Sequence, residues 1–261
     1  MHCKFFSAIT DIPASLWDGL FNSENPFVQH AFLAALEESG CVTAENGWQP
    51  QHMMLMDGEQ PLAVMPLYVK SHSYGEFVFD WGWAEAYQRN GLDYYPKLLT
   101  AVPFSPVAGP RFGVSPKAEP GEVLPAFYSA IGQFAKTHGF SGWHLLFADA
   151  ALQKVLSQIQ GGEPFLHREA VQFHWFNRDY RGFDDFLATL RSSRRKNLRR
   201  ERRIVAQQGV SLERKTGAAI SDEEWQGFYR CYTSTYLKRS GHEGYLNEDF
   251  SLVCVAPNAK A

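Results

Sequence analysis

Apolar residues near the start of the chain recur with the period of a helix, and later stretches switch to strand-like runs. Four of these residues share one helix face: Phe27, Phe32, Leu33 and Leu36. Gly40 follows where a helix C-terminus is expected. The same patterns predict further helices over residues 13–21, 94–102, 121–139 and 151–158. Strands are predicted over residues 4–9, 75–80 and 142–149.

A turn signal divides the apolar residues between 51 and 72 into two strands. Asp57-Gly58 lies between the two runs and predicts a hairpin. The second run contains Pro61 and Pro66, and proline cannot donate a ladder hydrogen bond. We therefore expect that strand to lie at a sheet edge or to contain a bulge.

The second part of the chain has longer helices and fewer strands. Strands are predicted over 167–180 and 210–216, and helices over 183–208 and 221–239. Because helices and strands interleave while the early strands form a meander, the pattern predicts a mixed α+β fold with mainly antiparallel sheets. We divide the chain into a domain over 1–164 and the start of a second domain over 165–261. So few strands in the second domain predict that it is incomplete.

The helix predicted over 183–208 carries a dense basic segment. Eight of the thirteen residues from Arg191 to Arg203 are basic, and Glu201 is the one acidic residue among them. The whole chain has a net charge of −3, so a segment with +7 leaves −10 for the remainder. At about 100° per residue, the basic residues cover a broad helix face beside a narrower apolar stripe. Arg194 is the exception, since it falls within the stripe.

The basic segment contains a ladder of like charges. Its members are spaced four residues apart: Arg191, Arg195, Arg199 and Arg203. Each such pair destabilises a helix by roughly 0.2–0.5 kcal/mol. A phosphate-bearing ligand would relieve this repulsion through charge-assisted hydrogen bonds, and acidic surfaces of the same chain could do so too. A simple solvated face is a third interpretation, and the sequence leaves all three open.

A second candidate site lies in the aromatic stretch between residues 83 and 111. Five aromatic residues could line a cleft: Trp83, Tyr87, Tyr94, Tyr95 and Phe104. Lys97 and Arg111 would supply positive charge, although ordinary core aromatics with solvated cations would give the same pattern. Three residues are candidates for a catalytic base, namely Asp80, Glu85 and His174.

Composition narrows the class of protein. The 261 residues are 45% hydrophobic and 15% aromatic, which is typical of a folded domain with a well-filled core. Four cysteines without a CxxC pair indicate a reducing compartment: Cys3, Cys41, Cys231 and Cys254. We find no signal peptide, no apolar run of about 20 residues and no HxxxH pair. The sequence thus predicts a cytoplasmic protein with no transmembrane segment and no metal site.

Two segments resemble one known family. The first, VQFHWFNRDYRGFDDFLATLRSSRRKNLRRERRIVAQQGVSLER, resembles the junction segment of Fem-type transferases. The matching residues are Gln172, Arg194, Arg195, Lys196, Asn197, Leu198, Arg199, Arg200, Gly209 and Val210. The second, DWGWAEAYQRNGLDYYPKLLTAVPFSPVAGPRF, is similar to the FemAB-like branch of peptidoglycan biosynthesis/recognition proteins. Together the similarities span most of the chain.

The resemblance implies tandem GNAT-like domains and transfer of an acyl or aminoacyl group to an amine. It implies a phosphate-bearing acceptor, either a small molecule or a lipid-linked peptidoglycan precursor, which the basic residues and Gln172 would bind. Acyl-CoA and aminoacyl-tRNA are the two donors to consider, and tRNA would then be a partner. The usual CoA-binding turn, Q/R-x-x-G-x-G/A, is absent from the sequence. Two alternatives stay open: a non-catalytic binding module for a cell-wall precursor or RNA, and an inactive truncated fragment of a CoA-dependent N-acyltransferase.

Overall fold

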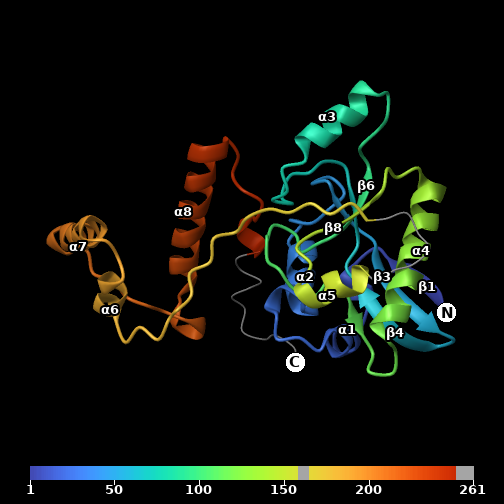
Figure 1. Ribbon diagram of the computed structural model, residues 1–261, viewed down its shortest axis with the longest axis horizontal. Coiled ribbons are helices and arrows are strands. Elements are labelled where there is room, and N and C mark those ends of the chain that lie inside the picture. The colour runs from blue at the N-terminus through green and yellow to red at the C-terminus, as the bar shows by residue number, and fades with distance from the viewer. Residues whose placement is uncertain (158–164, 251–261) are drawn as a thin grey trace. The chain divides into compact units, whose positions relative to one another are not determined.

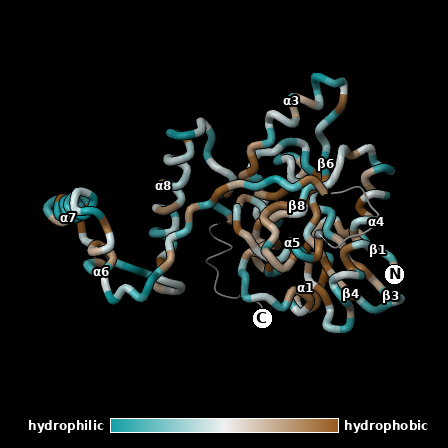
Figure 2. The backbone as a smooth tube through the Cα atoms, viewed as in Figure 1, coloured by the Kyte–Doolittle hydropathy of each residue, from teal (hydrophilic) through white to brown (hydrophobic). Residues whose placement is uncertain are grey.

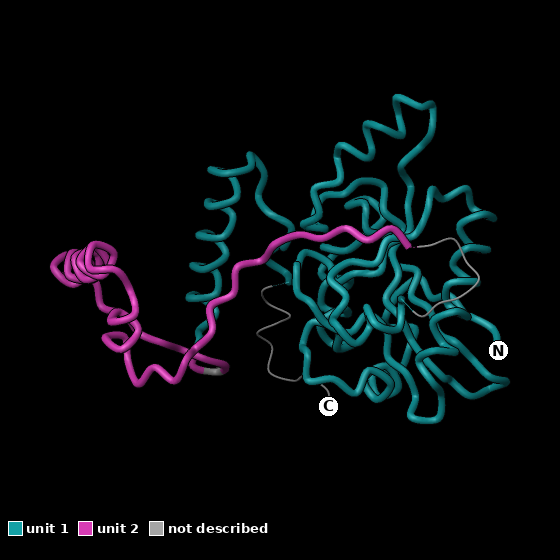
Figure 3. Tube along the Cα trace, viewed as in Figure 1, with its two compact units in different colours: residues 1–163, 220–261 teal, residues 164–219 magenta. Residues whose placement is uncertain are grey.

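The computed structural model describes residues 1–157 and 165–250, and internal contacts divide the chain into two units. Unit 1 comprises Met1–Glu163 and Ile220–Ala261, and unit 2 comprises Pro164–Ala219 (Figure 3). Cys254 lies outside the described residues. The two predicted GNAT-like domains and the incompleteness of the second remain predictions.

The first sheet of unit 1 is antiparallel throughout. Its strands run in the order β1 (His2–Phe6), β3 (His52–Asp57), β4 (Gln60–Met65) and β7 (Gly113–Val114). The predicted hairpin is confirmed, with Gly58 at a φ of 56° in the tight turn. Pro61 pairs with Met56 where the register shifts, so the bulge is confirmed. The edge position is wrong, because β7 pairs with the other side of β4.

The second sheet contains one parallel pair. Its order is β2 (Trp48–Pro50), β5 (Tyr68–Lys70), β6 (Lys97–Thr100) and β8 (Trp143–Leu145), with β6 and β8 parallel (Figure 1). The helix predicted over 94–102 is wrong, since these residues contain β6. All four residues of β6 are buried, and a short apolar run of this kind fits a central strand as well as a helix.

Helices cover both faces of the first sheet. Side chains alternate along β3, so Met53 and Leu55 pack with α4 (Pro120–His138). Met54 and Met56 pack on the opposite face with Trp17 of α1 (Ala14–Phe21). The residues of α2 (His30–Glu38) contribute to that core and to the core of the second sheet. Figure 2 shows the hydrophobic segments of unit 1 in these strands and helices.

The remaining elements of unit 1 are three helices and short 3-10 turns. They are η1 (Ile9–Asp11), η2 (Pro26–Val28), α3 (Trp81–Arg89), α5 (Ala150–Leu156) and α8 (Asp222–Ser240). The strand predicted over 75–80 is wrong, because these residues form a loop that leads into α3. No residue of α3 is buried, and Figure 1 shows this helix standing away from the sheets. The capping box of α8, between Ser221 and Glu224, is present.

Unit 2 contains α6 (Phe183–Ala188), α7 (Ser192–Gln207) and η3 (Gly217–Ala219). The single helix predicted over 183–208 is therefore wrong. Arg191 has an extended ψ of 147° and separates two helices. The strands predicted over 167–180 and 210–216 are also wrong for the described chain, because no neighbouring strand pairs with them.

The predicted fold class is confirmed. The described residues form a mixed α/β structure whose strand pairs are antiparallel except for β6 and β8. The segment after α8 packs against the core of unit 1: Asn247 Nδ2 donates to Ser39 O, and the ring of Phe250 meets that of Phe32 at 6.1 Å.

Candidate functional site

Lys97 lies at the centre of a buried charged network in unit 1. Its Nζ donates to Glu76 Oε2 at 2.9 Å, to Asp80 Oδ2 at 2.7 Å and to Ser73 Oγ at 2.9 Å. The side chains of Lys97 and Glu76 are fully buried, and that of Asp80 is 2% exposed. Because an ammonium group has three hydrogens to donate, these bonds occupy all of them.

The strand register explains why this network needs two carboxylates. Lys97 on β6 stands directly opposite Lys70 on β5, and like charges in that position repel each other. The loop between β5 and α3 contributes Glu76 and Asp80, which balance the two lysines. The sequence thus places two cations in the interior of a sheet and supplies the compensating anions from the adjacent loop.

Lys70 is the second buried cation of the network. Its Nζ lies 3.8 Å from the centroid of the Trp48 ring and donates to Tyr74 O at 3.4 Å. Burial lowers the pKa of Lys70 to about 7, with Glu76 opposing the shift and Lys97 adding to it. Lys70 can therefore exchange its proton near neutral pH.

The two carboxylates respond differently to the same surroundings. Burial raises the pKa of Glu76 even though Lys97 opposes the shift. Burial would also raise the pKa of Asp80, but the hydrogen bonds from Lys97 and Tyr94 outweigh it and hold that pKa below its usual range. Among the described residues, neither Glu76 Oε1 nor Asp80 Oδ1 has a hydrogen-bond partner.

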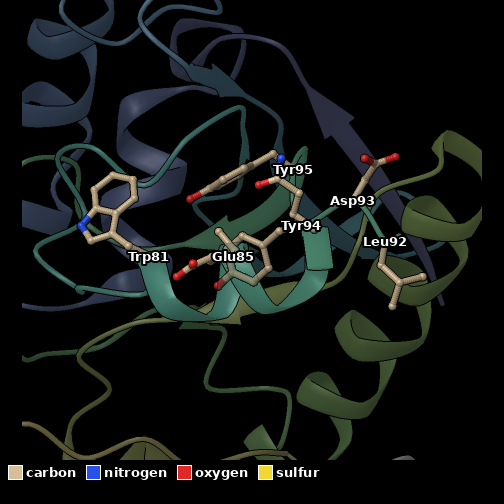
Figure 4. A pocket seen from close by; sticks show the side chains of 8 residues that line it. Trp81, Glu85, Leu92, Asp93, Tyr94 and Tyr95 are labelled. Atoms are coloured by element: carbon tan, nitrogen blue, oxygen red, sulfur yellow. The ribbon is translucent and has the colours of Figure 1, made fainter. Parts of the chain in front are cut away.

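An open pocket of about 420 Å³ lies beside the network. Residues from α3 and from the segment after it line the pocket: Trp81, Ala84, Glu85, Gln88, Leu92, Asp93, Tyr94 and Tyr95 (Figure 4). Tyr94 Oη donates to Asp80 Oδ2 at 2.7 Å, and Tyr95 Oη lies 2.7 Å from Ser73 Oγ. Two tyrosines of the pocket wall are thus hydrogen-bonded to the groups that hold Lys97.

The structure brings together part of the predicted aromatic site. Tyr94, Tyr95 and Glu85 line the pocket, and Asp80 and Lys97 lie behind its wall. Glu85 forms an exposed ion pair with Arg89 at 2.8 Å. Asp80, which we expected as a base, is instead held by a buried lysine.

The other predicted residues of this stretch lie elsewhere. Trp83 and Tyr87 are on α3, 42% and 36% exposed, and do not line the pocket. Arg111 is fully buried and donates to Leu146 O at 2.8 Å, to Pro110 O at 2.9 Å and to Val107 O. Burial lowers its pKa to about 10, although Asp149 opposes the shift. Neither Lys97 nor Arg111 faces solvent as the sequence suggested.

The predicted anion-binding residues belong to unit 2. No residue of α7 is buried, and Arg194 and Asn197 are exposed, so the apolar stripe is not a packed seam. Arg199 Nη2 lies 3.1 Å from Asp184 Oδ1, and the guanidinium of Arg202 lies 4.1 Å from the Phe183 ring centroid. The other basic residues of the segment form no ion pair with the described residues: Arg191, Arg194, Arg195, Lys196, Arg200 and Arg203.

His174 and Gln172 are also in unit 2. His174 Nε2 lies 3.3 Å from Gln172 Oε1, and both side chains are exposed. This contact gives His174 no carboxylate partner, and His174 stays a candidate base.

Sequence reasoning missed Lys70, Ser73, Glu76 and Trp81. A usable signal was present, because Lys70 ends a mainly apolar run and Lys97 begins another. A charged residue next to a buried strand calls for an opposite charge nearby. Glu76 and Asp80 in the intervening loop were the available partners.

The described residues contain no group of three or more His, Cys, Asp or Glu side chains that could hold a metal ion. None of their helices is long and apolar enough to cross a membrane.

Comparison with known proteins identifies a family. No curated protein matches the chain. Among solved structures, the chain is similar to the apo aminoglycoside antibiotic 6'-N-acetyltransferase of Acinetobacter haemolyticus, with 18% identity and a TM-score of 0.32 over 66% of this chain and 100% of that one. Residues 8–257 match the FemAB-like family, described as peptidoglycan biosynthesis/recognition. This match covers nearly the whole sequence, and the chain belongs to the FemAB-like family of peptidoglycan biosynthesis/recognition proteins.

Proposed function

We propose that this FemAB-like protein is a cytoplasmic acyl- or aminoacyltransferase acting on an amine of a phosphate-bearing peptidoglycan precursor. The observation that carries the proposal is the exposed basic face of α7. Seven of the eight basic residues of the 191–203 segment have no ion-pair partner among the described residues, and Arg199 is the exception. A ladder of like charges in which only Arg199 has an ion pair favours an anionic ligand over a purely structural role.

The chemistry of α7 matches phosphate groups. Arginine binds phosphate through planar, often bidentate hydrogen bonds, and its charge does not depend on pH near neutrality. Arg195 and Arg199 are one helical turn apart, so both can contact one diphosphate. A nucleotide- or lipid-linked precursor carries such a group, as tRNA carries a series of phosphates.

The pocket beside α3 offers a place for the group that is transferred. It combines the aromatic rings of Trp81, Tyr94 and Tyr95 with the carboxylate of Glu85. Transfer from an ester or thioester needs little covalent help, because that donor is already activated. Positioning of the amine and stabilisation of charge on the carbonyl oxygen can supply the rate enhancement.

Binding and transfer should be measured in parallel on the same preparation. We expect UDP-linked precursors, acyl-CoA or aminoacyl-tRNA to raise the melting temperature, and labelled acyl or aminoacyl groups to appear on the acceptor amine. Binding without transfer would favour the non-catalytic binding module. Absence of heat-stabilisation by all three ligand classes would contradict the proposal.

Arg194→Ala separates ligand binding from structure. Arg194 is exposed, so the variant should keep its melting temperature. It should bind the ligand roughly tenfold more weakly, since a hydrogen bond to a charged group contributes about 1.5–3 kcal/mol. Lys136→Ala removes an exposed cation from α4 in unit 1 and serves as the matched control. Equal loss of affinity in both variants would mean that α7 has no specific role.

A further inference from the structure

The hydroxyl group of Tyr95 has a hydrogen-bond geometry that the proposed function does not yet explain. Tyr95 lines the pocket beside α3, and its Oη lies 2.7 Å from Ser73 Oγ. Figure 4 shows the ring of Tyr95 extending over α3 toward Trp81. Either hydroxyl could donate in the Tyr95–Ser73 bond, and the direction decides whether Tyr95 has a hydrogen available for a ligand.

The surroundings of Ser73 indicate the direction of this bond. Lys97 Nζ donates to Ser73 Oγ at 2.9 Å, so Ser73 already accepts one hydrogen bond. If Tyr95 also donated to Ser73, the hydroxyl hydrogen of this buried serine would need another acceptor. Ser73 lies near enough to Asp80 to help hold its pKa low, but no hydrogen bond joins the two side chains among the described residues. Asp80 Oδ2 accepts from Lys97 and Tyr94, and Asp80 Oδ1 has no partner. Ser73 therefore donates its hydrogen to Tyr95 Oη, which lies 2.7 Å from Ser73 Oγ.

With Ser73 as donor, the Tyr95 hydroxyl accepts from the network and keeps its own hydrogen free. We infer that Tyr95 donates this hydrogen bond to an oxygen of the ligand in the pocket, with Ser73 and Lys97 acting as positioning residues. The ligand class is a carbonyl or carboxyl compound, because the proposed function places the acyl group in this pocket and its oxygen accepts a hydrogen bond. Lys97 is itself fixed by Glu76 and Asp80, so the whole chain of hydrogen bonds is held in place before the ligand arrives.

The role of Tyr95 in transfer rests on the proposed function. The amine nitrogen forms a bond to the carbonyl carbon of an ester or thioester, and the bond from that carbon to the leaving oxygen or sulfur breaks. The leaving atom takes the electron pair, and the proton lost by the amine goes to it. Tyr95 keeps its own proton throughout and stabilises the negative charge on the carbonyl oxygen. Burial raises the pKa of Tyr95, which favours this protonated form.

The kinetic test uses p-nitrophenyl acetate as an activated ester and glycinamide as the amine. Tyr95→Phe keeps the ring and should lower kcat by about 100-fold, with little change in KM, because the bond strengthens in the transition state. Ser73→Ala should lower kcat by a smaller factor, because the hydroxyl remains but loses its orientation. Tyr128→Phe, on α4 and outside the pocket lining, is the matched control and should retain the wild-type kcat. Wild-type kcat in Tyr95→Phe would overturn the inference.

A second measurement does not depend on turnover. With Cζ of tyrosine labelled by carbon-13, the Tyr95 resonance should shift when acetate is added, and the Tyr128 resonance should not. The Ser73→Ala variant should show a smaller Tyr95 shift. If the wild-type enzyme catalyses no transfer but Tyr95 shifts, the proposed function fails and the hydrogen-bond donor stands. If Tyr95 does not shift, its hydrogen is not free and the inference fails.

Discussion

The cations of unit 1 and those of unit 2 differ in burial and in charge compensation. In unit 1, Lys70 and Lys97 are fully buried, and two carboxylates from one loop compensate them. In unit 2, α7 exposes its arginines, and Arg199 has an ion pair with Asp184 in which both side chains are more than half exposed. Chemically similar groups are thus buried beside opposite charges in one region and exposed, mostly without an ion pair, in the other.

This difference indicates where each set of charges contributes. A buried charge without its partner is strongly unfavourable, so the paired cations of unit 1 affect the stability of the fold and the position of the pocket wall. Exposed cations contribute little to stability, because solvent screens them. Their free hydrogens are available to a ligand, so the cations of unit 2 bear on binding.

Lys97→Met should produce the largest loss of stability. It leaves Glu76 and Asp80 without their common partner in the interior, and breaking a buried ion pair costs about 3–5 kcal/mol. Urea unfolding of unit 1, followed by tryptophan fluorescence, measures the change. Adding Asp80→Asn removes one of the stranded charges and should recover part of the loss. An unchanged urea midpoint for Lys97→Met would show that the network does not stabilise the fold.

The lowered pKa of Lys70 predicts that the free energy of unfolding of unit 1 changes with pH. In the folded protein Lys70 loses its proton above about pH 7, whereas in the unfolded chain it keeps it to about pH 10.5. The unfolded state then binds more protons, so stability should rise with pH by up to about 1.4 kcal/mol per unit. Urea midpoints between about pH 7 and pH 9 measure this slope. This interval lies below the pH at which tyrosine side chains ordinarily lose their proton. Lys70→Met should lack this contribution, and equal slopes in both proteins would contradict the assignment.

The sequence predicted elements whose signals are local. The hairpin at Gly58, the helix that ends at Gly139 and the helix predicted over 221–239 all depend on a few neighbouring residues, and all are present. The predictions from sequence were wrong where residues distant in the sequence determine the local structure. The run from Lys97 to Thr100 is a strand because β5 and β8 flank it, and residues 167–180 form no strand because no described strand pairs with them.

The candidate site shows the same limit. The sequence identified Tyr94, Tyr95 and Lys97 as members of one aromatic and basic stretch. It could not show that Lys97 faces inward, because this depends on the register between β5 and β6. Composition also could not separate a compensated basic helix from an uncompensated one, since that requires the positions of the acidic side chains.

The smallest effect should come from the ladder on α7, and it should have the opposite sign. Arg195→Gln removes the repulsion of Arg195 with Arg191 and with Arg199, and glutamine has a similar helix propensity. The variant should stabilise α7 by about 0.4–1 kcal/mol. Arg199→Gln also loses the ion pair with Asp184, so its gain should be smaller. Hydrogen exchange of the α7 amides measures both changes, and added salt should shrink them. If Arg195→Gln instead loosens α7, the ladder is already compensated, and the contrast between buried and available charge does not extend to this helix.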